Sequence, residues 1–196
     1  GVRIVGSPNE VQKGETLVIR SHGVEQSVIE SCKDLEVEFV DATCPFVSKI
    51  HKIVTEKSEE DYVTIIAGDK NHQEVIGIVG HTFGEVYVVA TPEELQELVE
   101  LKQNFAQKKV IMVSQTTFNA KIWEKLQLFL KKVCTNAKIF DTICNATAMR
   151  QEEAYELSER SDAVIVIGGR HSSNTAKLFT VCKANCDKTY LIETAK

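Results

Sequence analysis

Two cysteines stand in a repeated motif that could hold a metal or carry out thiol chemistry. DATCPFV begins at Asp41 and DTICNAT begins at Asp141, so the pattern Asp-x-x-Cys occurs twice, ending at Cys44 and at Cys144. Each motif follows a short apolar run, VEFV in one case and KIF in the other. A single cysteine in such a chain is most often a small buried side chain. The repetition after two strand-like runs favours a shared chemical role for Cys44 and Cys144.

The other cysteines lack this context, and we expect them to be plain buried residues: Cys32, Cys134, Cys182 and Cys186. A disulfide framework is typical of short secreted chains, and no signal peptide is visible, so the reduced thiols of a cytoplasmic protein fit better. Cys182 and Cys186 are one helical turn apart, but they have no nearby histidine or cysteine to complete a metal site.

A histidine and a carboxylate lie two positions apart in GDKNHQE, directly after the apolar run YVTIIA. A carboxylate such as Glu74 can deliver a proton, and an imidazole such as His72 can contact an anion or tune its neighbour. Thr116 in SQTT adds a hydroxyl that can both donate and accept a hydrogen bond. The alternative interpretation is a solvated glutamate and a turn-forming threonine.

The elements that would position these residues are strands and helices in alternation. Apolar runs rich in valine and isoleucine predict strands at residues 16–20, 37–40, 62–67, 86–90, 109–113, 138–140, 163–168 and 189–193. Helical spacing of apolar residues is clear in 48–60, 91–103 and 117–133. Pro92 is expected in the first turn of one helix and Asn119 at the N-cap of another. Near-continuous apolar strands separated by helices predict an α/β fold, with parallel sheets flanked by helices.

Polar motifs follow most of these runs at the point where each strand is expected to end. They are SHGV, DATCP, GDKNHQE, SQTT, DTICNAT and GGRHSSN. In parallel α/β sheets, the carboxyl ends of strands and the following helix N-termini open onto one crevice, where free backbone N–H groups favour anions. The motifs therefore predict a single shared site.

Composition limits the class of protein. The chain has 196 residues, of which 43% are hydrophobic, and a formal net charge of −5. This length can bury a sizeable core in one domain or two, and the acidic balance argues against nucleic acid as the main partner. No apolar run approaches the ~20 residues of a membrane span, so no membrane partner is expected. Because the chain begins GVRIVG without Met and ends TYLIETAK, we expect a piece of a longer protein.

The motifs SHGV, DATCP, NHQEVIG, SQTT, DTICNAT and SSN, in this order and at these intervals, resemble the LytB/IspH family of 4-hydroxy-3-methylbut-2-enyl diphosphate reductases. The resemblance runs through nearly the whole chain. It implies pseudo-repeated lobes of a three-lobed iron–sulfur protein, with residues 1–44 ending lobe one, 45–143 forming a complete lobe two and 144–196 beginning lobe three. It also implies a two-electron, two-proton removal of an allylic hydroxyl in the non-mevalonate (MEP) isoprenoid pathway, which gives isopentenyl and dimethylallyl diphosphates.

The resemblance further implies a cofactor, a 4Fe–4S cluster held by one cysteine from each lobe. Cys44 and Cys144 match two of the three ligands. The counterpart of the family's first cysteine would precede Gly1, so this chain alone is expected to be inactive. One iron of such a cluster lacks a protein ligand and can act as a Lewis acid while electrons are fed in. The implied electron donor is a ferredoxin- or flavodoxin-type protein of the cytoplasm.

By the same resemblance, Glu74 delivers protons with Thr116 beside it. The residues that match diphosphate contacts are His22, His72, Thr147, Ser172, Ser173 and Asn174. Serine and asparagine at a helix start are also ordinary N-caps. The two roles are compatible, because the same helix end attracts an anion.

Two alternatives come from other classes of protein. A phosphorylated-ligand-binding α/β module without redox chemistry would keep His22 and SSN, but would need no paired Asp-x-x-Cys. A thiol oxidoreductase would need a resolving cysteine close to Cys44 or Cys144, and neither has a Cys-x-x-Cys neighbour.

The remaining histidines do not match the family's ligand positions. His51 lies in a charged helical pattern and is expected at the surface, while His81 follows a helical stretch and has no evident partner. His171, next to Ser172, is expected to be a loop residue rather than a diphosphate ligand.

Overall fold

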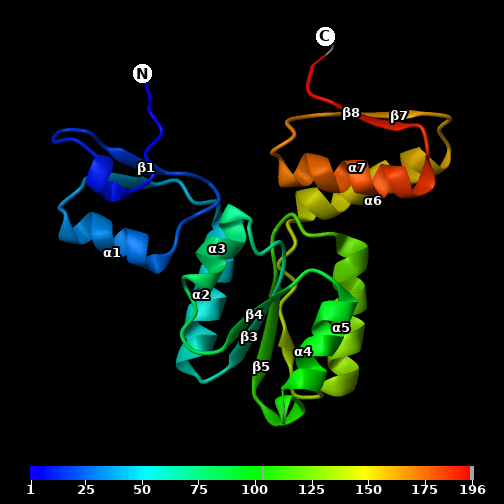
Figure 1. Cartoon of the computed structure of the whole chain (residues 1–196), viewed down its shortest axis with the longest axis horizontal. Helices are drawn as coiled ribbons and strands as arrows, with labels where there is room; N and C mark the ends of the chain where they lie inside the picture. The colour runs from blue at the N-terminus through cyan, green and yellow to red at the C-terminus, as the bar shows by residue number, and fades with distance from the viewer. Residues whose placement is uncertain (103, 195–196) are drawn as a thin grey trace.

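Strands and helices alternate along the chain in a computed structural model that describes residues 1–102 and 104–194 (Figure 1). The strands are β1 (Leu17–Ile19), β2 (Phe39–Asp41), β3 (Val63–Ala67), β4 (Val86–Val89), β5 (Val110–Ser114), β6 (Lys138–Ile139), β7 (Val164–Ile167) and β8 (Thr189–Ile192). The α-helices are α1 (Gln26–Asp34), α2 (Pro45–Glu59), α3 (Gln73–Val79), α4 (Pro92–Leu101), α5 (Ala120–Val133), α6 (Asn145–Glu159) and α7 (Ser173–Asn185). Two short 3-10 helices are η1 (Pro8–Glu10) and η2 (Phe105–Gln107). Each apolar run predicted as a strand overlaps one, and β2 and β5 extend one residue past the predicted runs 37–40 and 109–113.

The strands form three separate parallel sheets. The central sheet has the order β4-β3-β5-β6, and the two smaller sheets are β1-β2 and β7-β8. Helices α2 and α3 lie on one side of the central sheet, and α4 and α5 lie on the other (Figure 1). The predicted α/β fold with parallel sheets flanked by helices is therefore confirmed. The proposed boundaries after residues 44 and 143 would assign one sheet to each lobe.

Burial on both faces explains why the central strands are almost entirely apolar. Every residue of β3 and β5 is buried. Ile65 and Met112 pack toward Leu126 of α5, whereas Ile66 and Val113 belong to the cluster that includes α2 and α3. Because successive side chains of a strand point to opposite faces, each strand supplies both cores.

Local signals place the helix ends. Asn119 caps α5 by accepting a hydrogen bond from Ile122 N at 3.0 Å, as predicted, and Pro92 begins α4 behind the Thr91 cap. Helix α2 begins earlier than the predicted run 48–60, because Cys44 takes the N-cap and Pro45 the first turn. Gln103, the last residue of the predicted run 91–103, lies outside the described residues.

The strand register brings the loops together. Ala67 pairs with Ser114 at the carboxyl ends of β3 and β5, and Gln115 N donates to Ala67 O at 2.8 Å. Helices α6 and α7 lie beyond this end of the central sheet (Figure 1). Gln151 of α6 attaches them to the central core, since its amide accepts from Ala120 N and donates to Phe118 O, both at 3.0 Å.

We expect Leu126→Ala to destabilise the central core by about 2–5 kcal/mol, because it removes a fully buried side chain and leaves a cavity. Urea unfolding followed by the fluorescence of Trp123, the single tryptophan, which lies in the same cluster, measures this change. Leu128→Ala on the same helix is the matched control. Leu128 is 56% exposed, so its removal should cost less than about 0.5 kcal/mol. Equal losses in both variants would contradict the assigned core.

Candidate functional site

Glu74 and Thr116 form a buried pair where α3 meets the loop after β5. Glu74 is only 2% exposed. Its Oε1 accepts from the backbone N of Thr116 at 2.6 Å, and its Oε2 accepts from Thr116 Oγ1 at 2.7 Å. Both carboxylate oxygens therefore have a donor from one residue. The two residues predicted to handle protons are in direct contact.

The surroundings of Glu74 favour its protonated form. Burial raises the pKa of its carboxyl, and the hydrogen bonds from Thr116 lower it only in part. A carboxyl with a raised pKa holds a proton that it can donate to a substrate. This site has the character of a general acid.

His72 is the N-cap of α3 and fixes the backbone of Glu74, because His72 Nδ1 accepts from Glu74 N at 3.2 Å. The ring of His22 meets the ring of His72 edge to face, with centroids 5.6 Å apart. Burial lowers the pKa of both imidazoles. The positive charge of Arg20 lowers both further, and that of Lys177 also acts on His72. Cationic groups from different elements thus converge here, as an anion site requires.

Ser173 of α7 contacts the same edge. Thr117 Oγ1 and Ser173 Oγ are 2.9 Å apart, and Gln115 Nε2 donates to both hydroxyls, at 3.0 Å and 3.3 Å. Gln115 Oε1 also accepts from Asp69 N at 3.2 Å. A hydroxyl and amide cluster therefore lies next to the Glu74 carboxylate.

The two repeated cysteines differ from the other cysteines of the chain. Cys44 and Cys144 are partly exposed N-caps of α2 and α6, whereas the others are all buried. Among the buried thiols, Cys134, Cys182 and Cys186 donate to backbone carbonyls. The prediction that those cysteines and Cys32 are plain buried residues is confirmed.

Backbone hydrogen bonds place both repeated cysteines beside the site. Cys144 N donates to Thr116 O at 2.9 Å, and Cys44 N donates to Ser21 O at 3.0 Å, next to His22. A continuous chain of contacts thus runs from Cys44 through the histidines and Glu74 to Cys144.

The structure places the other predicted residues at helix starts. Ser172 caps α7 by accepting from Thr175 N at 3.3 Å, while Thr147 is buried in the first turn of α6. Asn174 has a buried Oδ1 that finds no hydrogen-bond partner within residues 1–102 and 104–194. Their diphosphate contacts stay predictions.

Some residues of the site escaped the sequence reasoning. Gln115 and Thr117 lie inside SQTT and Arg20 directly precedes SHGV, so their place in the motifs was the available signal. Lys177 lies in the turn of α7 that follows SSN. The position of the Lys177 ammonium group near His72 depends on how α7 packs, and no local sequence pattern reveals that packing.

The prediction that His51 lies at the surface is wrong. His51 is 8% exposed, and its ring stacks on His81 with centroids 4.0 Å apart. The charged pattern of α2 is real, but the loop after β1 covers the side of the helix that carries His51. His171 is exposed in a turn, as expected for a loop residue.

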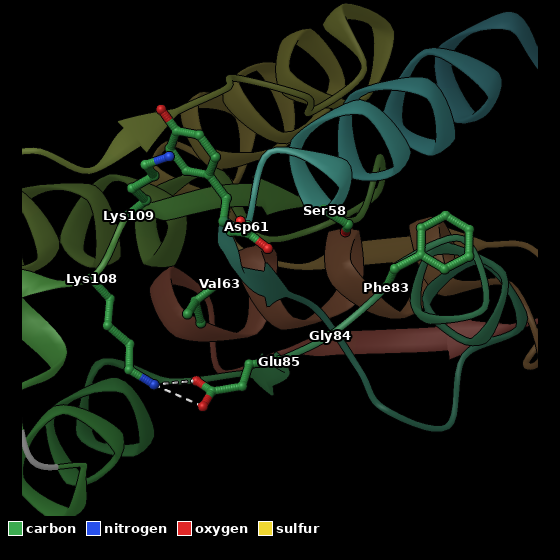
Figure 2. Close-up of a pocket in the computed structure, with 9 residues that line it drawn as sticks. Ser58, Asp61, Val63, Phe83, Gly84, Glu85, Lys108 and Lys109 are labelled. Atoms are coloured by element: carbon green, nitrogen blue, oxygen red, sulfur yellow. Dashed lines mark hydrogen bonds and ion pairs between the residues drawn. The ribbon is translucent and has the colours of Figure 1, made fainter.

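One of two pockets lies away from this edge, whereas the other reaches it at Arg20 and Gln73. One of about 480 Å³ opens at the amino ends of β3 and β5, where Lys108 binds Glu85 at 2.7 Å (Figure 2). A larger one of about 820 Å³ lies between the N-terminal segment and α3. Neither is lined by the predicted catalytic residues. Within residues 1–102 and 104–194, no group of three or more His, Cys, Asp or Glu side chains is arranged to hold a metal ion.

The chain matches the family described as LytB protein over residues 1–196. It is 43% identical to a 4-hydroxy-3-methylbut-2-enyl diphosphate reductase from Caldanaerobacter subterraneus, a match that covers all of this chain and 66% of the relative. It is 39% identical to the reductase from Nitratiruptor, a match that covers 100% of this chain and 68% of the relative. The chain spans about two thirds of the length of these curated relatives.

Two solved structures are similar to this one. A structure of (E)-4-hydroxy-3-methyl-but-2-enyl diphosphate reductase, the terminal enzyme of the non-mevalonate pathway, is 35% identical with a TM-score of 0.64, covering 95% of this chain and 65% of that one. The E-1-hydroxy-2-methyl-but-2-enyl-4-diphosphate reductase of Plasmodium falciparum is 30% identical with a TM-score of 0.88. This match covers 97% of this chain and 59% of that one.

The raised pKa of Glu74 predicts a pH-dependent contribution to stability. The folded carboxyl binds its proton more tightly than the unfolded one, so this contribution is present at acidic pH and is lost as pH rises through the folded pKa. The unfolding free energy of Glu74→Gln minus that of the parent should therefore increase as the pH rises above the ordinary pKa of glutamate, because only the parent loses this contribution. Urea unfolding at several pH values measures this difference.

Glu93→Gln is the control for this measurement. The exposed Glu93 carboxyl has a lowered pKa, mainly because its own backbone and Thr91 donate hydrogen bonds to it, so the relative stability of this variant should change with pH in the opposite direction. A flat difference for Glu74→Gln would show that the carboxyl titrates normally.

Proposed function

The chain belongs to the LytB protein family, and from this premise we propose that it supplies the proton-donating and diphosphate-binding groups of an iron–sulfur oxidoreductase. The reaction is the reductive dehydroxylation of 4-hydroxy-3-methylbut-2-enyl diphosphate to isopentenyl and dimethylallyl diphosphates. Two electrons and two protons enter, and the hydroxyl leaves as water. The observation that carries the proposal is the contact chain from Cys44 through His22, His72, Glu74 and Thr116 to Cys144.

The cysteines of this chain fit an iron–sulfur cofactor as two of its ligands. Cys44 and Cys144 carry partly exposed thiols at the N-termini of 15-residue helices, where the helix dipole favours an anionic cluster. We propose a 4Fe–4S cluster whose third cysteine comes from a segment outside these 196 residues, so that this chain alone is inactive. When bound, such a cluster supplies electrons and a Lewis-acidic iron.

The diphosphate would lie between His22 and His72 and the start of α7. Both imidazoles have depressed pKa values in the absence of an anion, because burial and neighbouring positive charge disfavour protonation. A bound diphosphate reverses that electrostatic balance and gives the imidazoles and Lys177 a partner. Ser172, Ser173, Asn174 and Thr147 add hydroxyl and amide groups at helix N-termini, where free backbone N–H groups favour phosphate.

Glu74 would deliver the proton that turns the departing hydroxyl into water. Its raised pKa keeps the proton available, and Thr116 Oγ1 can relay it because a hydroxyl both donates and accepts. His72 holds the backbone of Glu74 and so fixes the direction of the carboxyl.

The proposal includes a protein partner and a compartment. Electrons would come from a ferredoxin- or flavodoxin-type donor in the cytoplasm. None of the described helices is long and apolar enough to cross a bilayer. The net charge of −5 does not favour nucleic acid as a partner.

The competing function is a binding module that holds a phosphorylated ligand without redox chemistry. It would use the same histidines and the start of α7, but it leaves the two exposed cysteine N-caps without a role. Absence of iron and acid-labile sulfide from the anaerobically purified full-length protein would favour this module.

We expect Glu74→Gln in the full-length protein to lower turnover by about 10²-fold or more, because the amide cannot donate the required proton. Cluster absorbance and affinity for the diphosphate should change much less. Glu60→Gln, an exposed carboxyl that pairs with Lys57, is the control and should leave turnover unchanged. Normal turnover in Glu74→Gln would remove this carboxyl from the mechanism.

Replacing either proposed ligand should reduce cofactor content. After anaerobic reconstitution of the full-length protein, Cys44→Ser and Cys144→Ser should each lose most of the iron and sulfide per chain, because a hydroxyl is a poor substitute for a soft thiolate. Cys134→Ala is the control, since that thiol is buried against Ala106 O and Asn136. Full iron content in both serine variants would show that other residues hold the cluster.

A further inference from the structure

A stacked pair of histidines, one buried and one half-buried, lies between the proposed first and second lobes, outside the contact chain of the proposed site. His51 comes from α2, and His81 follows α3. Their rings stack with an interplanar angle of 22° and centroids 4.0 Å apart. Neither residue belongs to the groups assigned above to proton transfer, diphosphate or iron.

The pair holds the backbone of the loop that carries His22. This loop turns at Gly23, which has a φ of 71°. A Cβ placed on Gly23 would lie 2.6 Å from Cε1 of His51, so the ring packs directly against this turn. Next along the loop, Val24 O accepts from Nε2 of His81 at 3.1 Å. Each member of the pair therefore contacts the loop within two residues of His22.

Both histidines are fixed by the second lobe. Thr55, one turn after His51 on α2, donates its hydroxyl to His81 O at 3.0 Å. Gly80, the C-cap of α3, lets the loop lie close to that helix, because a Cβ at this position would be 2.4 Å from the Cβ of Glu25. The loop thus rests on α2 and α3 with little room to shift.

These contacts connect the elements on which the proposed site depends. Cys44 caps α2, His72 caps α3, and the loop carries His22. We propose that His51 and His81 are positioning residues that hold the His22 loop against α2 and α3, so that His22 faces His72 across the diphosphate site. This inference rests on the proposed function, which assigns the diphosphate to those two imidazoles.

The shape of the His51 ring, rather than its charge, holds the turn at Gly23. Nε2 of His51 is buried and has no hydrogen-bond partner among the described residues. Burial and the charge of His81 lower the pKa of His51 to about 4, although Asp41 opposes this in part, so the ring is neutral near pH 7. A flat neutral ring of similar size should therefore replace it.

The test measures the binding of inorganic pyrophosphate to the full-length protein by calorimetry. His51→Leu keeps an apolar side chain of moderate size but loses the flat ring, and it should weaken pyrophosphate binding by about 10-fold, because the loop is no longer fixed. His51→Phe keeps a stacked ring and should bind within about 2-fold of the parent. Lys52→Ala, an exposed neighbour on α2, is the matched control and should not change binding.

Activity separates positioning from a general structural effect. In His51→Leu, KM for the diphosphate substrate should rise with the affinity loss, while kcat and cluster absorbance stay near the parent values. Equal pyrophosphate affinity in His51→Leu and His51→Phe would overturn the proposal. Failure of both variants to fold would also overturn it, because the pair would then be a general packing element. If the parent protein binds pyrophosphate but lacks reductase activity, the proposed function fails. In that case the difference in pyrophosphate affinity between His51→Leu and His51→Phe still tests whether the histidine pair positions the His22 loop.

Discussion

A carboxylate buried as deeply as that of Glu74 needs hydrogen-bond donors, and Thr116 supplies both of them. This requirement constrains several elements at once. Glu74 can reach Thr116 only if α3 begins directly beyond β3, and Thr116 is available only because β5 ends level with β3. The carbonyl of Thr116 in turn holds the backbone of Cys144. One buried carboxyl group therefore ties the start of α3, the end of β5 and the start of α6 into a single arrangement.

The two Asp-x-x-Cys motifs have the same backbone role but different side-chain partners. In each, the cysteine caps a helix directly after a strand. Asp41 accepts hydrogen bonds from the backbone and hydroxyl of Thr43, whereas Asp141 accepts from the indole N–H of Trp123 at 3.2 Å. The repeat thus preserves the direction in which the cysteine is presented, while each aspartate adapts to its own surroundings.

The sequence was informative wherever a short segment determines its own structure. Strands buried on both faces are almost entirely apolar, so β3 and β5 could be recognised directly, and the Asn119 cap followed from one side chain and one backbone N–H. The motifs at strand ends indicated the Glu74 and Thr116 pair for the same reason. His51 could not be predicted in this way, because its burial depends on the loop after β1, which comes from a different part of the chain. The charge of Lys177 near His72 likewise depends on the packing of α7, which no local pattern encodes.

The three sheets differ in how completely they are covered, and this difference has consequences for motion. Both faces of β3 and β5 are buried, but Val18 of β1 and Ile167 of β7 are 61% and 69% exposed, on sheets of only two strands. Two-stranded sheets are marginal by themselves, and segments with few buried contacts open at lower free energy than the core. Amide protons of the β1-β2 and β7-β8 sheets should therefore exchange with solvent through local opening, while those of the central strands exchange only when the core itself unfolds. Within this chain, Ser173 would then belong to a unit that fluctuates, whereas Glu74 belongs to the unit that stays fixed and the His22 loop is held against that unit by His51 and His81.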